Sequence, residues 1–184
     1  MVPSSAFRAD GSLNVVIETP RGAAAKFKYD EPSDAIMLSR ALPLGIAYPY
    51  DWGFVAATKA PDGDPIDAMV LWDCASYPGV VVPARIIGVL GVEQRNLGSG
   101  SRERNDRLFV VPIKAHRMDD VKTIFDLPGR VRDEIVRFFV NVVAFEGKDV
   151  RVLDFDGPSE GERLVRAAQP ARAIQGDRGS RSQL

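Results

Sequence analysis

The 184-residue chain is poor in two residue types that often carry chemistry, because it has one cysteine and one histidine. The lone Cys74 cannot form a disulfide within the chain. It follows the apolar run AMVLWDC, so we expect a buried thiol with no redox role. One histidine and one cysteine also exclude a zinc site built from several such ligands.

Long apolar runs, excess charge and nucleotide-binding glycine motifs are absent too. No run approaches the ~20 apolar residues that a membrane span requires, and the first residues lack the charged start and apolar stretch of a signal peptide. The formal net charge of -1 gives no general attraction for nucleic acid. Neither GxGxxG nor GxxxxGK[ST] occurs, which excludes the Rossmann and P-loop interpretations. We therefore expect a cytoplasmic protein that binds neither nucleic acid nor membrane.

The overall composition is that of a globular protein, with 45% apolar and 27% charged residues. A chain of this length is sufficient for one domain with a real core. We expect that domain over residues 13–169, after a flexible N-terminal stretch of residues 1–12. The polar tail of residues 170–184 is predicted to be disordered.

The chain is predicted to begin with strands and to end with helices. After Met118, apolar residues at helical spacing between Pro128 and Gly147 predict one long amphipathic helix. A further strand over 150–155 and a weaker helix over 158–169 follow, and the polar stretch 96–105 is predicted to be a loop. This order favours an α+β, mainly β domain with a barrel or curled sheet. Segments rich in Val, Ile and aromatic residues predict strands at 13–18, 25–29, 36–38, 53–58, 66–72, 80–92 and 107–113.

Three carboxylates lie within six positions at Asp62, Asp64 and Asp67, in the stretch DGDPID. Carboxylates so close repel one another, and a bound cation offsets that repulsion. Gly63 permits a tight turn and Pro65 stiffens it. Hard oxygen ligands suit Mg²⁺, Mn²⁺ or Ca²⁺. Spacing alone leaves two interpretations open, a divalent metal site and a solvated acidic turn.

The surroundings of this turn resemble those of the family I soluble inorganic pyrophosphatases. The family signature D-x-D-P-x-D, followed by a small or apolar residue, matches Asp62 to Ala68. The upstream element matches Tyr48, Pro49 and Gly53, and the resemblance extends over roughly residues 13 to 145. It implies an OB-type five-stranded barrel flanked by helices, and a homo-oligomer. It also implies the Mg²⁺-dependent hydrolysis of pyrophosphate, a small phosphate substrate, with Mn²⁺ as a possible replacement.

The resemblance also implies roles for individual residues. Asp62 and Asp67 resemble metal ligands, and Asp64 resembles the carboxylate that accepts the proton from the attacking water. Glu18 resembles an acidic residue in the outer shell of the metals, and Asp106 is a candidate for a further ligand. The residues that resemble the substrate-binding groups are Lys26, Arg40, Tyr48 and Arg107.

The sequence departs from the family pattern at several of these places. Lys28 stands where the family has a carboxylate, and Trp52 replaces a tyrosine. Asn105 stands two residues before Arg107, where the family has an aspartate, whereas Asp106 is one residue out of register and on a strand would point to the opposite face. The late tyrosine and lysine of the family are Val142 and Val143 here.

These replacements leave two interpretations of function. The first is an enzyme, a divergent metal-dependent pyrophosphatase or a related phosphoanhydride hydrolase. The intact aspartates at 62, 64 and 67 favour it. The second is a non-catalytic relative that binds phosphate, nucleotide or a protein partner. The loss of the family's loop aspartates, and of the late tyrosine and lysine that would hold phosphate, favours it.

Overall fold

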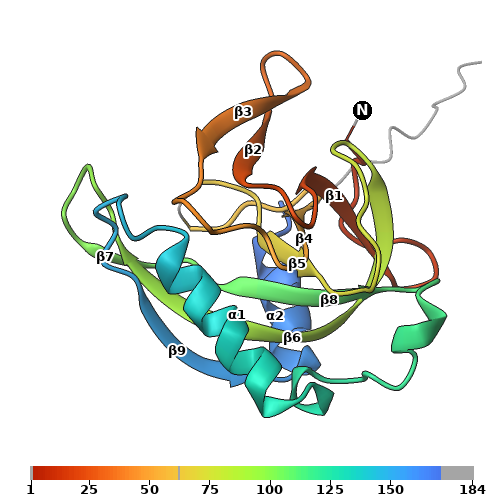
Figure 1. The fold of residues 1–184 in the computed structure, drawn as a ribbon. Coiled ribbons are helices and arrows are strands. Elements are labelled where there is room, and N and C mark those ends of the chain that lie inside the picture. Colours follow the sequence, from red (N-terminus) through yellow and green to blue (C-terminus); the bar gives the residue numbers. More distant parts are fainter. Residues whose placement is uncertain (1, 62, 171–184) are drawn as a thin grey trace, which may run out of the picture.

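The structure is a computed structural model that describes residues 2–61 and 63–170. Five strands pair in the order β1-β4-β5-β8-β6, and β6 pairs again with β1, so that the sheet closes into a ring (Figure 1). Strands β5 and β8 are parallel and the other ring neighbours are antiparallel. The members of the ring are β1 (Leu13–Thr19), β4 (Asp51–Val55), β5 (Asp67–Val70), β8 (Arg107–Pro112) and β6 (Val81–Arg95).

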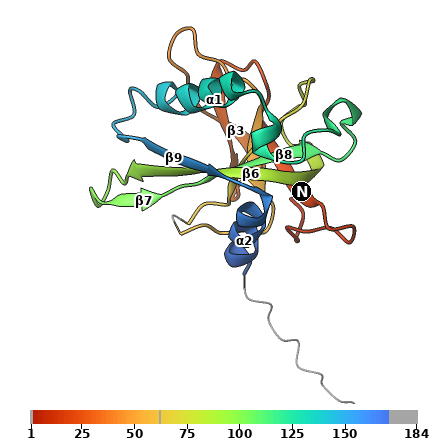
Figure 2. The same ribbon diagram turned by 90° about the horizontal axis from the view of Figure 1, so that it is seen from below.

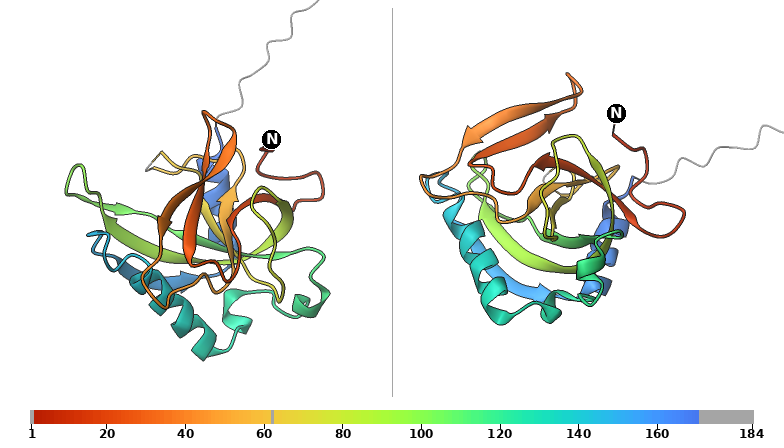
Figure 3. Two further views of the ribbon diagram at one scale, coloured as in Figure 1. Left: turned by 45° about the horizontal axis from the view of Figure 1, so that its top comes forward. Right: turned by 45° about the vertical axis from the view of Figure 1, so that its right-hand side comes forward.

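Further elements surround this ring. Strands β2 (Ala25–Asp30) and β3 (Ala35–Ala41) form a hairpin that stands away from it (Figure 3). Strands β7 (Arg102–Arg104) and β9 (Arg151–Asp156) both pair with the long strand β6. Helix α1 (Gly129–Asn141) and helix α2 (Pro158–Ala168) lie on opposite sides of β6 and β9 (Figure 2). Two short 3-10 helices, η1 (His116–Met118) and η2 (Ile124–Asp126), precede α1.

Alternate residues of the ring strands pack into two separate apolar clusters. On β8, Phe109 belongs to the cluster that includes Phe139 of α1, whereas Val110 belongs to the cluster that includes Val165 of α2. Successive side chains of a strand point to opposite faces, so a strand that is apolar throughout is covered on both faces. The two helices provide that cover.

Strand β4 approaches β1 very closely at Gly53. A Cβ atom added there would overlap the backbone carbonyl oxygen of Val16. Only glycine fits this position, which lies between the upstream aromatic element and the acidic turn. The close approach fixes the position of β4 relative to β1, and with it the position of the neighbouring Trp52 on one face of the ring.

The α+β, mainly β class is confirmed, and strands or helices occupy every segment where they were predicted. Two predictions are wrong. Residues 102–104 of the expected loop form β7, because the chain folds back on β6 as a hairpin. Cys74 is exposed, because β5 ends at Val70 and the chain bends toward the surface before it reaches the thiol.

The domain limits of residues 13–169 stay a prediction. Before them, Ala6 is fully buried and Phe7 forms a bridge with Leu13. Of the predicted disordered tail, residues 171–184 lie outside the described residues.

Candidate active site

A cavity of about 230 Å³ lies among the β2–β3 hairpin, one face of the ring and the segment that follows α1. Four residues predicted to bind substrate, Lys26, Arg40, Tyr48 and Arg107, line it together with Asp64. These residues come from separate segments of the chain, so only the tertiary fold brings them together. The other described lining residues are Lys28, Ser39, Trp52, Val92, Gln94, Phe138, Phe139, Val142, Val143, Glu146, Lys148 and Val150.

Asp67 and Arg107 form an ion pair at the edge of this cavity. They begin the parallel strands β5 and β8, in which Ala68 is paired in register with Leu108. The two side chains therefore start at the same level of the sheet and on the same side. Their exposed fractions are only 23% for Asp67 and 13% for Arg107, so water screens this pair weakly. Asn105 adds a side-chain oxygen that accepts a hydrogen bond from the same guanidinium.

Asp64 forms the second carboxylate contact of the site. The Lys28 ammonium lies 2.8 Å from its Oδ2 atom, which joins the β2–β3 hairpin to the acidic turn. Both side chains are about half exposed, at 47% for Lys28 and 59% for Asp64. The third predicted carboxylate, Asp62, lies outside the described residues.

Lys26 is a largely buried cation that lines the cavity. Burial and, to a smaller extent, the nearby charge of Arg107 together lower its pKa to about 8, while Glu18 acts in the opposite direction. Glu18 itself is buried, and its Oε1 accepts a hydrogen bond of 2.7 Å from the backbone N–H of Tyr29. Burial raises the pKa of Glu18, against that hydrogen bond and the charge of Lys26. Glu18 interacts electrostatically with Lys26 but is not among the lining residues.

Arg40 connects the hairpin to the segment after α1. It faces Lys26 across the β2–β3 pair. Its Nη2 donates a hydrogen bond of 2.9 Å to the backbone oxygen of Val142. Its Nε lies 3.4 Å from a carboxylate oxygen of Glu146. The guanidinium is therefore held at the wall of the cavity by groups 102 residues or more along the chain.

Two aromatic side chains form one wall. Tyr48 is buried against Trp52 and Phe138, and that burial raises its pKa. The guanidinium carbon of Arg107 lies 5.5 Å from the ring centre of Trp52, a cation–π arrangement. The indole N–H of Trp52 is buried and has no hydrogen-bond partner among the described residues. The replacement of a tyrosine by Trp52 thus keeps an aromatic surface for Arg107.

The structure does not bring Asp106 to the cavity. Its carboxylate accepts a hydrogen bond of 3.1 Å from the backbone N–H of Val92 and pairs with Arg104 at 2.9 Å. Arg104 lies beside Gly91 of β6, because its Nη2 would be 3.2 Å from a Cβ atom added at that glycine. The one-residue offset between Asp106 and Asn105 thus separates a structural carboxylate from a side chain that contacts Arg107.

The donors of this site are suited in kind to a hard divalent cation, because they are carboxylate oxygens. Within residues 2–61 and 63–170, however, no three His, Cys, Asp or Glu side chains gather closely enough to hold a metal ion. Both Asp64 and Asp67 already contact a cationic side chain. A metal held by these residues would share the carboxylates with Lys28 and Arg107 or displace them.

No sequence pattern predicted several of the polar lining residues, among them Glu146, Lys148 and Gln94. Glu146 and Lys148 flank Gly147, the residue taken only as the end of the helix, and Gln94 lies on β6. No motif marks them. Glu146 and Lys148 reach the cavity because the chain folds back toward it after α1, and Gln94 reaches it because β6 extends to residue 95. The one available signal in the sequence was Gly147 between two charged residues, which favours a turn; the structure confirms the turn with a positive φ of 68° at this glycine.

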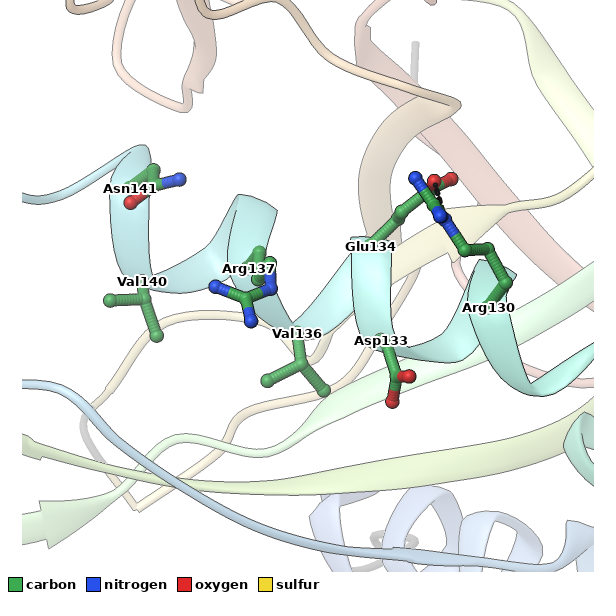
Figure 4. Close-up of a pocket in the computed structure, with 7 residues that line it drawn as sticks. All are labelled: Arg130, Asp133, Glu134, Val136, Arg137, Val140 and Asn141. Carbon is green, nitrogen blue, oxygen red and sulfur yellow. Dashed lines mark hydrogen bonds and ion pairs between the residues drawn. The ribbon is translucent and has the colours of Figure 1, made fainter.

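A larger hollow of about 660 Å³ lies along the outer side of α1 (Figure 4). Arg130 and Glu134 in its lining form an ion pair at 2.8 Å, and Val136 and Val140 provide apolar surface (Figure 4). None of the predicted site residues lines it. The smaller cavity is therefore the candidate active site.

Comparisons with known proteins agree with this placement. The family model described as inorganic pyrophosphatase matches residues 15–172, and the chain belongs to this family. The inorganic pyrophosphatase of Synechocystis is 39% identical over 78% of this chain and 81% of its own length. That of Campylobacter jejuni is 42% identical over 78% and 81%. The crystal structure of the inorganic pyrophosphatase from Thermus thermophilus has a TM-score of 0.81 at 35% identity, covering 91% of this chain and 94% of the other.

The fold comparison also supports the ring of five strands as the family's barrel. The Helicobacter pylori inorganic pyrophosphatase has a TM-score of 0.78 at 35% identity, over 91% of this chain and 95% of the other. Among the described residues, no helix is both long enough and apolar enough to span a membrane.

Proposed function

We propose that this chain hydrolyses inorganic pyrophosphate to two phosphate ions, with Mg²⁺ as the metal and Mn²⁺ as a working replacement. Family membership supports this activity. The observation that carries the assignment to a site is the meeting of Lys26, Arg40, Tyr48 and Asp64 with Arg107 in one small cavity. Its volume of about 230 Å³ lies below the roughly 300 Å³ at which pockets for drug-sized ligands begin, which favours a small anion over a nucleotide.

In this proposal Asp67 and Asp62 hold the metal ion, with Glu18 behind them as an outer-shell carboxylate. When bound, the ion supplies charge neutralisation and activation of a water molecule. The oxygen of the attacking water forms a bond to one phosphorus atom, and Asp64 accepts the proton that this water loses. The bond from that phosphorus to the bridging oxygen breaks, and the leaving phosphate takes up the proton.

The cationic and aromatic wall orients the substrate. Lys26, Arg40 and Arg107 neutralise the phosphate oxygens, and the Tyr48 hydroxyl donates a hydrogen bond to one of them. Arg40 is positioned for this task by its bond to Val142 and its contact with Glu146. Because most of the barrier in phosphoryl transfer is overcome by positioning and electrostatics, this preorganised wall is the main contribution of the protein.

The test is phosphate release from pyrophosphate with Mg²⁺, with Mn²⁺ and with EDTA. Asp64→Asn should lower kcat by about 100-fold or more, because the variant cannot accept the proton. Asp120→Asn, at an exposed aspartate distant from the cavity lining, is the matched control and should behave as the wild type. Release that is absent from the wild type under every condition, or that persists unchanged in Asp64→Asn, contradicts the proposal.

The non-catalytic alternative has one observation in its favour, the contact between Lys28 and the proposed proton acceptor Asp64. It predicts binding of phosphate without turnover in the same assay. The cytoplasmic location and a homo-oligomeric state are further proposals, supported by the family resemblance. Light scattering coupled to gel filtration tests the oligomeric state.

A further inference from the structure

The described lining of the cavity is rich in positive charge. It includes five cationic side chains, Lys26, Lys28, Arg40, Arg107 and Lys148, against the two carboxylates of Asp64 and Glu146. Such an excess in a confined, partly dry space raises the local positive potential. The cavity is therefore suited to an anion before any metal ion enters it.

The β2–β3 hairpin contributes three of these cations to the same side. Lys26 and Lys28 are two residues apart on β2, and Arg40 faces Lys26 across the hairpin. Like charges placed opposite one another destabilise a strand pair, and a bound anion relieves that repulsion. Within residues 2–61 and 63–170, neither Lys26 nor Lys148 has a carboxylate within ion-pair distance.

Lys28 contacts Asp64 of the acidic turn directly. Its ammonium lies 2.8 Å from Asp64, at the mouth of the cavity where both side chains are about half exposed. In a phosphate-transferring site, a divalent ion supplies positive charge between the carboxylates and the incoming anion. The Lys28 ammonium is a positive group in the corresponding place. The side chain is flexible and unburied, so it can contact Asp64 and a phosphate oxygen at the same time.

We propose that the cavity binds the diphosphate anion without a metal ion, and that Lys28 supplies there part of the positive charge a divalent ion would bring. The inference rests on the proposed function for placing diphosphate in this cavity. It goes further in separating binding of the anion from the requirement for metal in hydrolysis.

The experiment is calorimetric titration of imidodiphosphate, which resists hydrolysis, into the full chain in EDTA. We expect saturable binding with one site per chain, weakened about tenfold in Lys28→Met, because the variant loses a charge-assisted contact to the anion. Lys114→Met, at an exposed lysine outside the cavity lining, is the matched control and should bind as the wild type. Lys28 is half exposed, so its replacement should leave thermal unfolding unchanged, which circular dichroism checks.

Asp64→Asn should change the metal-free affinity in the opposite direction to Lys28→Met. Removing this negative charge frees Lys28, so metal-free binding should become tighter by a few-fold, whereas an anion held through a metal on the acidic turn should bind more weakly. No binding in EDTA, or equal affinity in wild type and Lys28→Met, overturns the inference.

Hydrolysis is measured separately, so the two proposals fail in different ways. Binding in EDTA without turnover in Mg²⁺ contradicts only the proposed function. Turnover in Mg²⁺ without binding in EDTA contradicts only the metal-free binding.

Discussion

Arg107 contacts the carboxylate of Asp67 across two neighbouring parallel strands, at the point where both strands begin. One residue is the last carboxylate of the acidic motif and the other lies 40 positions further along the chain. The pair connects the predicted metal site to the predicted phosphate site through a single contact.

A double-mutant cycle should detect this coupling. Asp67→Asn and Arg107→Met should each lower the free energy of unfolding by about 1–3 kcal/mol in EDTA, because each removes one partner of a weakly screened ion pair. The double variant should lose less free energy of unfolding than the sum of the two single losses, and the difference, the coupling energy, should be about 0.5–3 kcal/mol. Urea unfolding of the four proteins measures it, and simple additivity would show that the contact contributes nothing to folding.

Lys26 predicts a stability that rises with pH above neutrality. Its pKa in the folded protein is about 8, whereas a lysine in an unfolded chain titrates near about 10.4. Below pH 8 it is protonated in both states and the burial of its charge destabilises the fold in full. Between about 8 and 10.4 the folded state releases the proton first, so the free energy of unfolding increases with pH, by up to about 3 kcal/mol.

Urea unfolding between pH 7 and pH 10 measures this effect as a difference between wild type and Lys26→Met. The variant should be more stable at pH 7 and should lack the rise. Lys114→Met, an exposed lysine, is the control and should keep it. A rise of equal size in Lys26→Met would assign the effect to other groups.

Asp51 is predicted to be critical for stability although it lies outside the cavity lining. Its carboxylate is fully buried and accepts hydrogen bonds from the backbone N–H of Arg21 at 2.7 Å, the indole of Trp72 at 2.8 Å and the backbone N–H of Ser76 at 3.0 Å. Asp51→Ala leaves these donors unsatisfied and should lower the free energy of unfolding by about 3 kcal/mol or more. Asp120→Ala, at an exposed aspartate, should change it by less than about 0.5 kcal/mol in the same urea titration.

Gly53 should not tolerate a side chain. Gly53→Ala forces a Cβ atom into the backbone oxygen of Val16, so β1 and β4 must separate, and we expect a loss of more than about 3 kcal/mol or failure to fold. Gly157→Ala is the matched control, because no atom lies within 4 Å of the added Cβ and its φ is −76°. Thermal unfolding should therefore leave the Gly157 variant near the wild type. Similar melting temperatures for both variants would contradict the close approach at Gly53.

The local patterns predicted the elements well because each element is encoded over a few residues. The apolar spacing after Met118 predicted α1, and the Val- and Ile-rich segments predicted the ring strands. The prediction failed where a distant segment decides the structure. Strand β7 exists only because β6 lies beside it, and Cys74 is exposed because the strand before it ends early.

The candidate site divides in the same way. The sequence by itself determined the residue types of the acidic turn, the register that sets Asp106 apart from Asn105, and the membership of a family, because motif and alternation are local properties. Only the tertiary structure decided that Lys28 contacts Asp64, that Arg107 contacts Asp67 and that the segment after α1 completes the cavity. Charges interact through space over a few ångströms, and separation along the chain does not reveal which of them the closed ring brings together.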